Sequence, residues 1–146
     1  MSLQRVLLIG CWPLLGSLGT ALAGPPCPAP ADIATAHFVG DWALSLAATP
    51  GQKPERGLLS LQPHPIYSDS LKGALQRGAQ GWQVVADWED DTLTLEESPD
   101  GERISATWQA RPVAGQCGRV FEGVRFTGSE PDASAQRFRM SAIGAR

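Results

Sequence analysis

The residue with the clearest chemical potential in this sequence is a glutamate inside an apolar, aromatic segment. Glu122 lies in GRVFEGVRF, whose side chains alternate between two faces if the segment is a strand. One face carries Val120, Glu122, Val124 and Phe126, and the other carries Arg119, Phe121, Gly123 and Arg125. Whichever face is buried, at least one charge points into the core and needs a partner. Two roles stay open for Glu122: an ion pair with a neighbouring arginine at a wet rim, or a polar contact for the head group of a ligand.

Catalytic chemistry has little support elsewhere in the sequence. His37 and His64 are the two histidines, and no Gly-x-Ser-x-Gly motif is present. His64 lies between two prolines, which is typical of a solvated loop. The acidic segment DWEDDTLTLEESPDGE (87–102) is rich in carboxylates but lacks the Asp-x-Asp-x-Asp-Gly spacing of a calcium loop. We therefore expect a protein that is not an enzyme, with no catalytic residues, no metal and no cofactor.

The first 23 residues have the build of a secretory signal peptide. One positive charge, Arg5, precedes an apolar segment over 6–18, and small residues at 21–23 precede the expected cleavage after Ala23. The apolar segment is too short and too interrupted by proline and glycine for a membrane anchor. Lipidation at Cys11, in LIGC, is the alternative, although the apolar run before it is short. The sequence thus predicts a periplasmic or secreted protein that is not inserted in a membrane after cleavage.

The mature chain would keep two cysteines, Cys27 and Cys117. An even pair in an oxidising compartment indicates a disulfide, which here would close a loop of about 90 residues. In the chain-entropy view such a loop contributes about 3–5 kcal/mol to the free energy of unfolding. Two unrelated thiols, or a link between two copies through Cys27, remain alternatives.

The overall charge gives no sign of a nucleic-acid partner. The net charge of the full chain is −3, whereas a nucleic-acid-binding surface would be basic. Acidic residues crowd the segment 87–102 and arginines follow from 103 onward, so two charged faces are expected. We expect a monomer.

Hydrophobic residues in the rest of the chain recur with period two, which is typical of strands with one buried face. Strands are predicted at 40–46, 57–62, 71–77, 82–88, 91–97, 103–110, 118–127 and 136–143, and a short helix within 29–38 with Asp32 as its cap. Short Gly- and Pro-containing turns join the strands, and SPDG (98–101) is the best hairpin turn. The predicted fold class is all-β: a single antiparallel up-and-down barrel of about eight strands, preceded by a proline-rich arm. The domains are the signal peptide 1–23, the arm 24–36 and the barrel 37–146.

Alternation also predicts which side chains fill the barrel. The expected inward set is Trp42, Leu44, Leu46, Leu59, Leu61, Leu71, Leu75, Trp82, Val84, Trp88, Leu93, Leu95, Ile104, Trp108, Val124, Phe126, Phe138 and Met140. An eight-stranded barrel is just wide enough to be filled by such residues or to hold one small ligand. Smaller residues on the same faces, such as Gly73 and Ala86, could leave a cavity or let the tryptophans interdigitate. Which face of 118–127 is inside stays open.

The segment HFVGDWALSL (37–46) resembles the opening motif of the lipocalins and their calycin relatives, which include avidins and periplasmic inhibitors of secreted metalloproteases. The resemblance covers about ten residues and the strand count. It implies that Trp42 plugs one end of the barrel and that Arg125, Arg137 or Arg139 packs across its ring. A central Thr-Asp-Tyr pattern is missing, and Ala43 and Leu44 replace the polar residue of an avidin. The resemblance therefore concerns the fold and leaves the ligand open.

The function expected from these observations is that of an exported, non-enzymatic β-barrel that binds a small, largely apolar molecule. Trp82, Trp88 and Trp108 would line the site, with Glu122 near its mouth. One alternative is a protein-binding module such as an inhibitor of an exported protease, which would present residues 24–26 (Gly-Pro-Pro) as a stiff arm. Another is an envelope protein with a filled core and charged faces that bind a protein partner.

The intact mass of the exported protein tests the N-terminal prediction. Removing 23 of the 146 residues should leave a chain of 123 residues. Its mass should be two hydrogens lower than that of the reduced chain, because Cys27 and Cys117 are bonded. A mass increased by a diacylglycerol on a chain that begins at Cys11 would instead establish lipidation.

Overall fold

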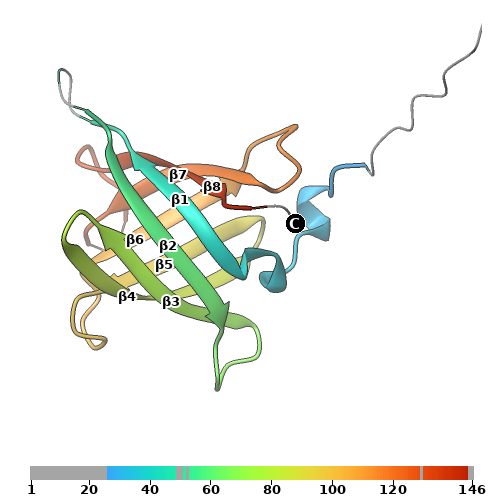
Figure 1. Ribbon diagram of the computed structural model, residues 1–146, viewed down its shortest axis with the longest axis horizontal. Helices are drawn as coiled ribbons and strands as arrows, with labels where there is room; N and C mark the ends of the chain where they lie inside the picture. Colours follow the sequence, from blue (N-terminus) through green and yellow to red (C-terminus); the bar gives the residue numbers. More distant parts are fainter. Residues whose placement is uncertain (1–25, 49–50, 52, 129, 145–146) are drawn as a thin grey trace, which may run out of the picture.

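The computed structural model describes residues 26–48, 51, 53–128 and 130–144. Eight antiparallel strands follow one another around a closed barrel, and the last pairs with the first (Figure 1). The strands are β1 Gly40–Leu46, β2 Glu55–Pro63, β3 Ser70–Arg77, β4 Gln80–Glu89, β5 Thr92–Ser98, β6 Ala106–Pro112, β7 Val120–Phe126 and β8 Gln136–Ala142. Closure pairs every strand on both sides, so no edge is left exposed. The predicted up-and-down barrel is confirmed, whereas the predicted signal peptide and Cys11 lie outside the described residues.

The strand bounds lie close to the predicted ones, and β6 differs most. It begins at Ala106 rather than at 103, because the preceding residues form a loop that is bonded to β5. The backbone N–H of Ser105 donates to the carbonyl oxygen of Glu97 at 2.8 Å. Ile104, predicted to point inward, is consequently exposed in this loop. Within SPDG, Gly101 has the predicted positive φ, at 81°.

The barrel interior is packed with the predicted leucines and aromatic residues, with one correction in β7. The inward side chains of β7 are those of Phe121, Gly123 and Arg125, while Val124 lies half-buried on the outer face. Phe121 is fully buried, and Phe126, at the end of the strand, is also buried. The sequence alternation predicted two faces here but could not decide between them. The inner face is the one that carries Phe121 near the start of the strand and Arg125 near its end.

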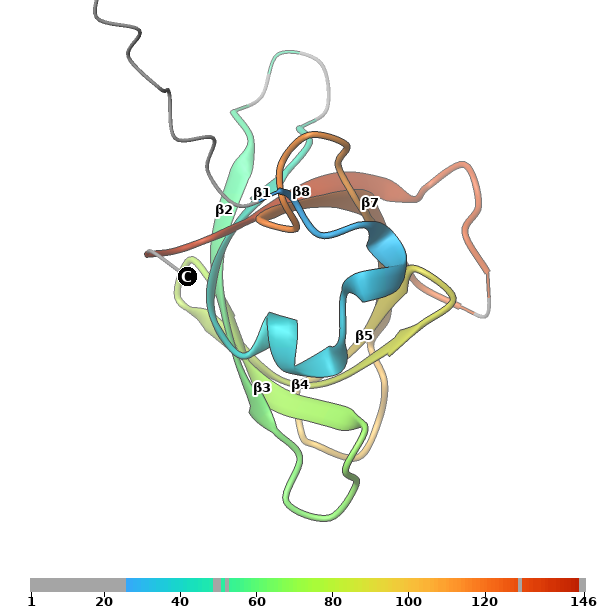
Figure 2. The same cartoon turned by 90° about the vertical axis from the view of Figure 1, so that its right-hand side faces the viewer.

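Two short 3₁₀ helices cover one end of the barrel, where a single helix was predicted (Figure 2). They are η1, Pro30–Asp32, and η2, Thr35–Phe38. Asp32 is the last residue of η1 rather than its cap, and its carboxylate accepts a hydrogen bond from the backbone N–H of Ala29 at 3.2 Å. None of the helices in the described residues is long and apolar enough to span a membrane.

The covered end of the barrel, called here the closed end, is sealed by an aromatic cluster. Trp42 is fully buried, and its Nε1–H donates to the carbonyl oxygen of Phe38 at 2.9 Å. The Phe38 ring lies 4.9 Å from that of Phe121 and 5.1 Å from that of Trp88. Such aromatic pairs add about 0.5–1.5 kcal/mol each to the free energy gained from buried area. Trp42 is thus a buried member of the aromatic cluster at the closed end.

A covalent bond fastens this cover to the barrel. Cys27 and Cys117 form the predicted disulfide, across 90 residues of chain. Beside it, the Nε2–H of His37 donates to the carbonyl oxygen of Gly118 at 2.6 Å. The segment 26–39 is therefore tied to the loop between β6 and β7 at two points. Disulfides persist in oxidising compartments, so this bond favours a location outside the cytoplasm.

The backbone of β6 leaves no room for a side chain at Gly123, an inward residue of β7. A Cβ atom added at Gly123 would lie 1.7 Å from the carbonyl oxygen of Gln109 in β6. That distance is well below van der Waals contact, so the backbone itself would have to move. Glycine at this position lets the sheet bend sharply enough to close, which is a common use of glycine in barrels.

Replacing Gly123 by alanine should destabilise the barrel more than the same change at another strand glycine. We expect Gly123→Ala to lower the free energy of unfolding by about 1–3 kcal/mol, as overpacking does. Gly81→Ala in β4 is the matched control, because its added Cβ would meet its nearest atom at 3.9 Å. Urea unfolding measures both variants, and equal free energies of unfolding would contradict this account of closure.

Candidate functional site

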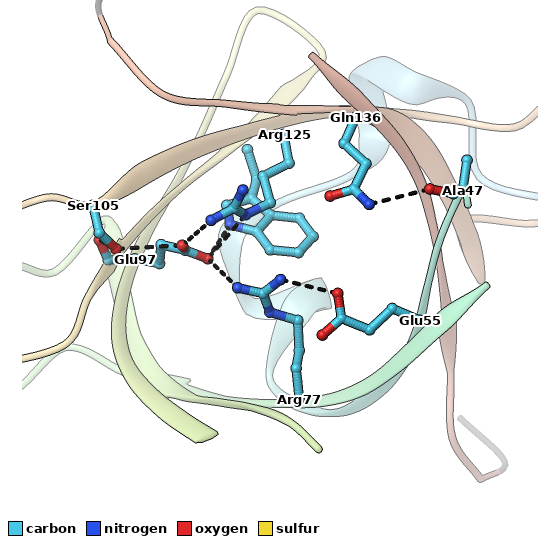
Figure 3. A network of polar contacts seen from close by, with 8 residues as sticks. Ala47, Glu55, Arg77, Glu97, Ser105, Arg125 and Gln136 are labelled. Atoms are coloured by element: carbon cyan, nitrogen blue, oxygen red, sulfur yellow. Dashed lines mark hydrogen bonds and ion pairs between the residues drawn. The ribbon is translucent and has the colours of Figure 1, made fainter. Parts of the chain in front are cut away.

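The strongest candidate for a functional site is a group of charged side chains inside the barrel, at the end opposite the two helices. We call this end the mouth, and we call Glu55, Arg77, Glu97 and Arg125 the mouth cluster (Figure 3). Glu97 is at its centre and is fully buried. It follows Leu93 and Leu95 on the inner face of β5. A carboxylate in such a place needs hydrogen-bond donors and positive charge around it.

Glu97 obtains these partners from four residues. Trp108 donates its indole N–H to Oε2 at 2.9 Å, and Ser105 donates its hydroxyl to Oε1 at 3.3 Å. Arg125 binds the carboxylate with both Nε and Nη2, and Nη2 of Arg77 lies 3.6 Å from Oε2. A carboxylate offers about four acceptor positions, and these contacts use them. Glu97 is therefore a fixed counterion that orients two arginines, with no lone pair left for a ligand proton.

Arg77 is the least satisfied member of the mouth cluster. Its side chain is 8% exposed, and Nη1 contacts Oε2 of Glu55 at 3.3 Å. The guanidinium carbon lies 4.2 Å from the ring centroid of Trp82 and 5.7 Å from that of Trp108. A stacked cation of this kind gains about 0.5–2 kcal/mol. Nε of Arg77 is buried without a hydrogen-bond partner among the described residues, and an unpaired buried donor costs about 1–3 kcal/mol.

The mouth cluster adjoins an open cleft at the rim. Figure 3 shows Arg77, Arg125, Glu55 and Gln136 around the mouth, with Glu97 to one side. The side-chain amide of Gln136 donates to the carbonyl oxygen of Ala47 at 3.1 Å and joins β8 to the end of β1. Arg125, Gln136 and Ala47 also line a surface cleft of about 530 Å³. Arg125 therefore contacts Glu97 on its inner side and this cleft on its outer side.

The loop after β5 forms the rim beside Glu97, and the carboxylate of Asp100 bonds to several groups within it. The carboxylate of Asp100 accepts hydrogen bonds from the backbone N–H groups of Arg103 and Glu102 and pairs with the Arg103 side chain. These contacts, led by the backbone N–H of Arg103, hold the pKa of Asp100 far below its usual range. A lowered folded pKa means that the stabilisation is present above the ordinary carboxyl pKa and is lost as the pH falls. The loop should therefore keep its shape throughout the neutral range.

The three tryptophans predicted to line a ligand site are divided between the two ends of the barrel. Trp108 is buried against Glu97, and half-buried Trp82 stacks on Arg77, so both belong to the mouth. Trp88 is half-buried at the closed end, where it contacts Phe38 and Phe121. The structure thus brings two of the three together and places the third at the opposite end.

Glu122, the other predicted site residue, lies on the outer face of β7. Its side chain is 53% exposed and forms an ion pair with Arg139 of β8. It therefore adopts the ion-pair arrangement, although on the outside of the barrel rather than at its mouth. The other face of the same strand supplies the inward charge, which is Arg125.

The arginines expected to pack across Trp42 lie elsewhere. Arg137 and Arg139 are exposed on the outer face of β8. Arg125 is at the mouth, with its guanidinium carbon 5.6 Å from the ring centroid of Trp108. The cation that the resemblance placed over the plug tryptophan is thus found over a different tryptophan, at the other end of the barrel.

The sequence reasoning missed Arg77 and Glu97, although the alternation contained the signal. Arg77 continues the inward series of Leu71 and Leu75, and Glu97 continues that of Leu93 and Leu95. Both charges therefore fall on the inner face of their strands, at the mouth ends of β3 and β5. The sequence pattern groups Glu97 with the acidic segment 87–102, because its neighbours in the chain are acidic.

Fold and site define a small closed antiparallel barrel with a sealed aromatic end and a charged mouth. Within the described residues, no group of three or more histidines, cysteines and carboxylates is arranged to hold a metal ion. The sequence matches no protein-family model, and no curated protein is detectably similar to it. The class of fold is thus established by the structure.

Neutralising Glu97 should lower the free energy of unfolding far more than neutralising its neighbour Glu96. Glu97→Gln leaves Arg125 without its carboxylate counterion and Arg77 with only the half-exposed Glu55, and breaking a buried ion pair in this way typically costs about 3–5 kcal/mol. Glu96→Gln is the matched control, since it makes the same change one residue earlier on the exposed face of β5. Urea unfolding followed by tryptophan fluorescence gives both free energies of unfolding. Similar values for the two variants would show that the mouth cluster contributes little.

Proposed function

We propose that this chain is an exported, non-enzymatic binding protein that holds a small, largely apolar ligand at the mouth of its barrel. The observation that carries the proposal is Arg77. Its buried guanidinium stacks on half-buried Trp82, and its own Nε–H has no hydrogen-bond partner among the described residues. Buried charges are costly, and well-packed apolar residues often replace them without loss of stability. The buried charge of Arg77 is therefore better explained by a role in ligand binding than by a contribution to folding stability.

The packing of the interior supports a shallow site. Leu46 is fully buried and pairs with Glu55 of the mouth cluster across β1 and β2, and Phe138, which is nearly as buried, pairs with Leu46 across β1 and β8. The ring of Trp108 packs edge-on against that of Phe138, with 4.8 Å between their centroids. A ligand would therefore lie on this apolar floor, among Trp82 and the two arginines, rather than deep in the barrel as a lipocalin ligand would.

The chemistry of Glu97 supports a binding role over a catalytic one. Its oxygens accept bonds from Trp108, Ser105 and Arg125, so they are not available to take a proton from a substrate. The disulfide fits the proposed export, and we place the protein in the periplasm or outside the cell on that basis together with the signal-like N-terminus.

Native mass spectrometry of the protein purified from its own host tests the proposal. We expect a bound mass of a few hundred daltons on the wild-type protein. Trp82→Phe should reduce the occupied fraction several-fold, because a smaller ring supports both the stacked arginine and the ligand less well. Trp88→Phe is the matched control, since Trp88 is also half-buried but lies at the closed end. Protein without any companion mass, in every preparation, would contradict the proposal.

Protein binding is a second candidate, and one observation favours it. Ile66 is 77% exposed and Tyr67 is 61% exposed, next to each other on the loop between β2 and β3. Nδ1 of His64 accepts the backbone N–H groups of both residues at 3.2 Å, so the loop holds them outward in a defined shape. A protein-sized companion in the same spectra, lost on Ile66→Ser, would support this candidate instead.

A further inference from the structure

We infer that the ligand of the mouth carries one carboxylate, which binds Arg77 in place of Glu55. This inference rests on the proposed function and assigns the chemical class of the ligand. It follows from three properties of the mouth cluster. The cluster has more hydrogen-bond donors than acceptors, Glu97 is bound more firmly than Glu55, and the four charges sum to zero.

The mouth has more donors than acceptors. Each guanidinium has five N–H donors and no acceptor, so Arg77 and Arg125 together present ten. The contacts among the described residues occupy both Nη atoms of Arg77, and Nε and Nη2 of Arg125. Nε of Arg77 is buried and unpaired. A ligand with acceptor oxygens would supply what the protein lacks at this point.

The two carboxylates of the mouth cluster are held very differently. Glu97 is fully buried and accepts bonds from three side chains, so it cannot leave without unpairing all of them. The Glu55 side chain is 47% exposed and touches Arg77 through one contact at 3.3 Å. Solvent screens the half-exposed carboxylate, so this single contact holds Glu55 weakly. Glu55 is therefore the carboxylate that a ligand can displace into solvent.

The charge balance selects a monoanion. With Glu55 in place, two arginines and two glutamates give the mouth cluster no net charge. When Glu55 turns into solvent, Arg77, Arg125 and Glu97 leave one positive charge. One carboxylate restores neutrality, and its planar pair of oxygens matches a guanidinium edge. The apolar body attached to it would lie against Trp82, whose ring already packs on the Arg77 guanidinium.

Two probes of the same shape, 2-naphthoate and 2-naphthamide, separate charge from apolar contact. Their dissociation constants can be measured by isothermal titration calorimetry on wild type, Glu55→Gln and Glu122→Gln. Glu122→Gln is the control, because it removes an equal charge from a glutamate of similar exposure that pairs with an arginine on the outer face. Glu55 and Glu122 both lie partly in solvent, so neither change should unfold the barrel, and urea unfolding verifies this.

We expect the naphthoate to bind more tightly than the naphthamide, and Glu55→Gln to tighten naphthoate binding by roughly two- to fivefold, as removal of an exposed competing pair would. Naphthamide binding should not change, and Glu122→Gln should resemble wild type. Equal affinities of the two probes would overturn the carboxylate and leave the proposed function standing. No tightening in Glu55→Gln would overturn the exchange. If neither probe binds, the inference fails, and the companion mass in native spectra decides separately whether the mouth binds any small molecule.

Discussion

The rest of the structure depends on the need to compensate one buried carboxylate. Glu97 has no contact with solvent, so every one of its acceptor positions must be filled from within the barrel. That requirement orients the indole of Trp108, brings Ser105 of the rim loop against β5, and fixes arginines from β3 and β7 over the interior. The side chain of Glu97 thus joins four strands and a loop at the mouth.

The two ends of the barrel are closed by different kinds of interaction. At the closed end, Phe38, Trp42 and Phe121 pack through apolar contact, and the disulfide between Cys27 and Cys117 fastens the cover. Apolar packing is non-directional and contains no charged partner that another ion could replace. At the mouth, by contrast, the ion pairs are directional, and the partner of Arg77 on the solvent side is half exposed. This difference between the two ends is what the proposed binding at the mouth rests on.

Most of the fold could be predicted because its strands carry a clear period of two. The alternation that includes Leu93 and Leu95, followed by the turn SPDG, is enough to place β5 and its end. Alternation and turn residues likewise place β1 to β4. The site was harder, because the members of the mouth cluster lie in four strands, β2, β3, β5 and β7, and alternation shows only the face of each. In GRVFEGVRF both faces carry an apolar residue and a charge, so Glu122 and Arg125 were equally plausible inward residues.

The sequence alone predicted the strand number, the closed architecture and the inward direction of most apolar side chains, and it favoured a disulfide between the two cysteines over the alternatives. These follow from local properties, namely alternation, turn residues and composition. The tertiary structure alone decided that Arg77, Glu97 and Arg125 meet, that Trp82 and Trp108 belong to the mouth, and that Trp88 belongs to the opposite end. The register between neighbouring strands sets these distances, and it depends on how the whole sheet bends to close, notably where β7 passes β6 at Gly123.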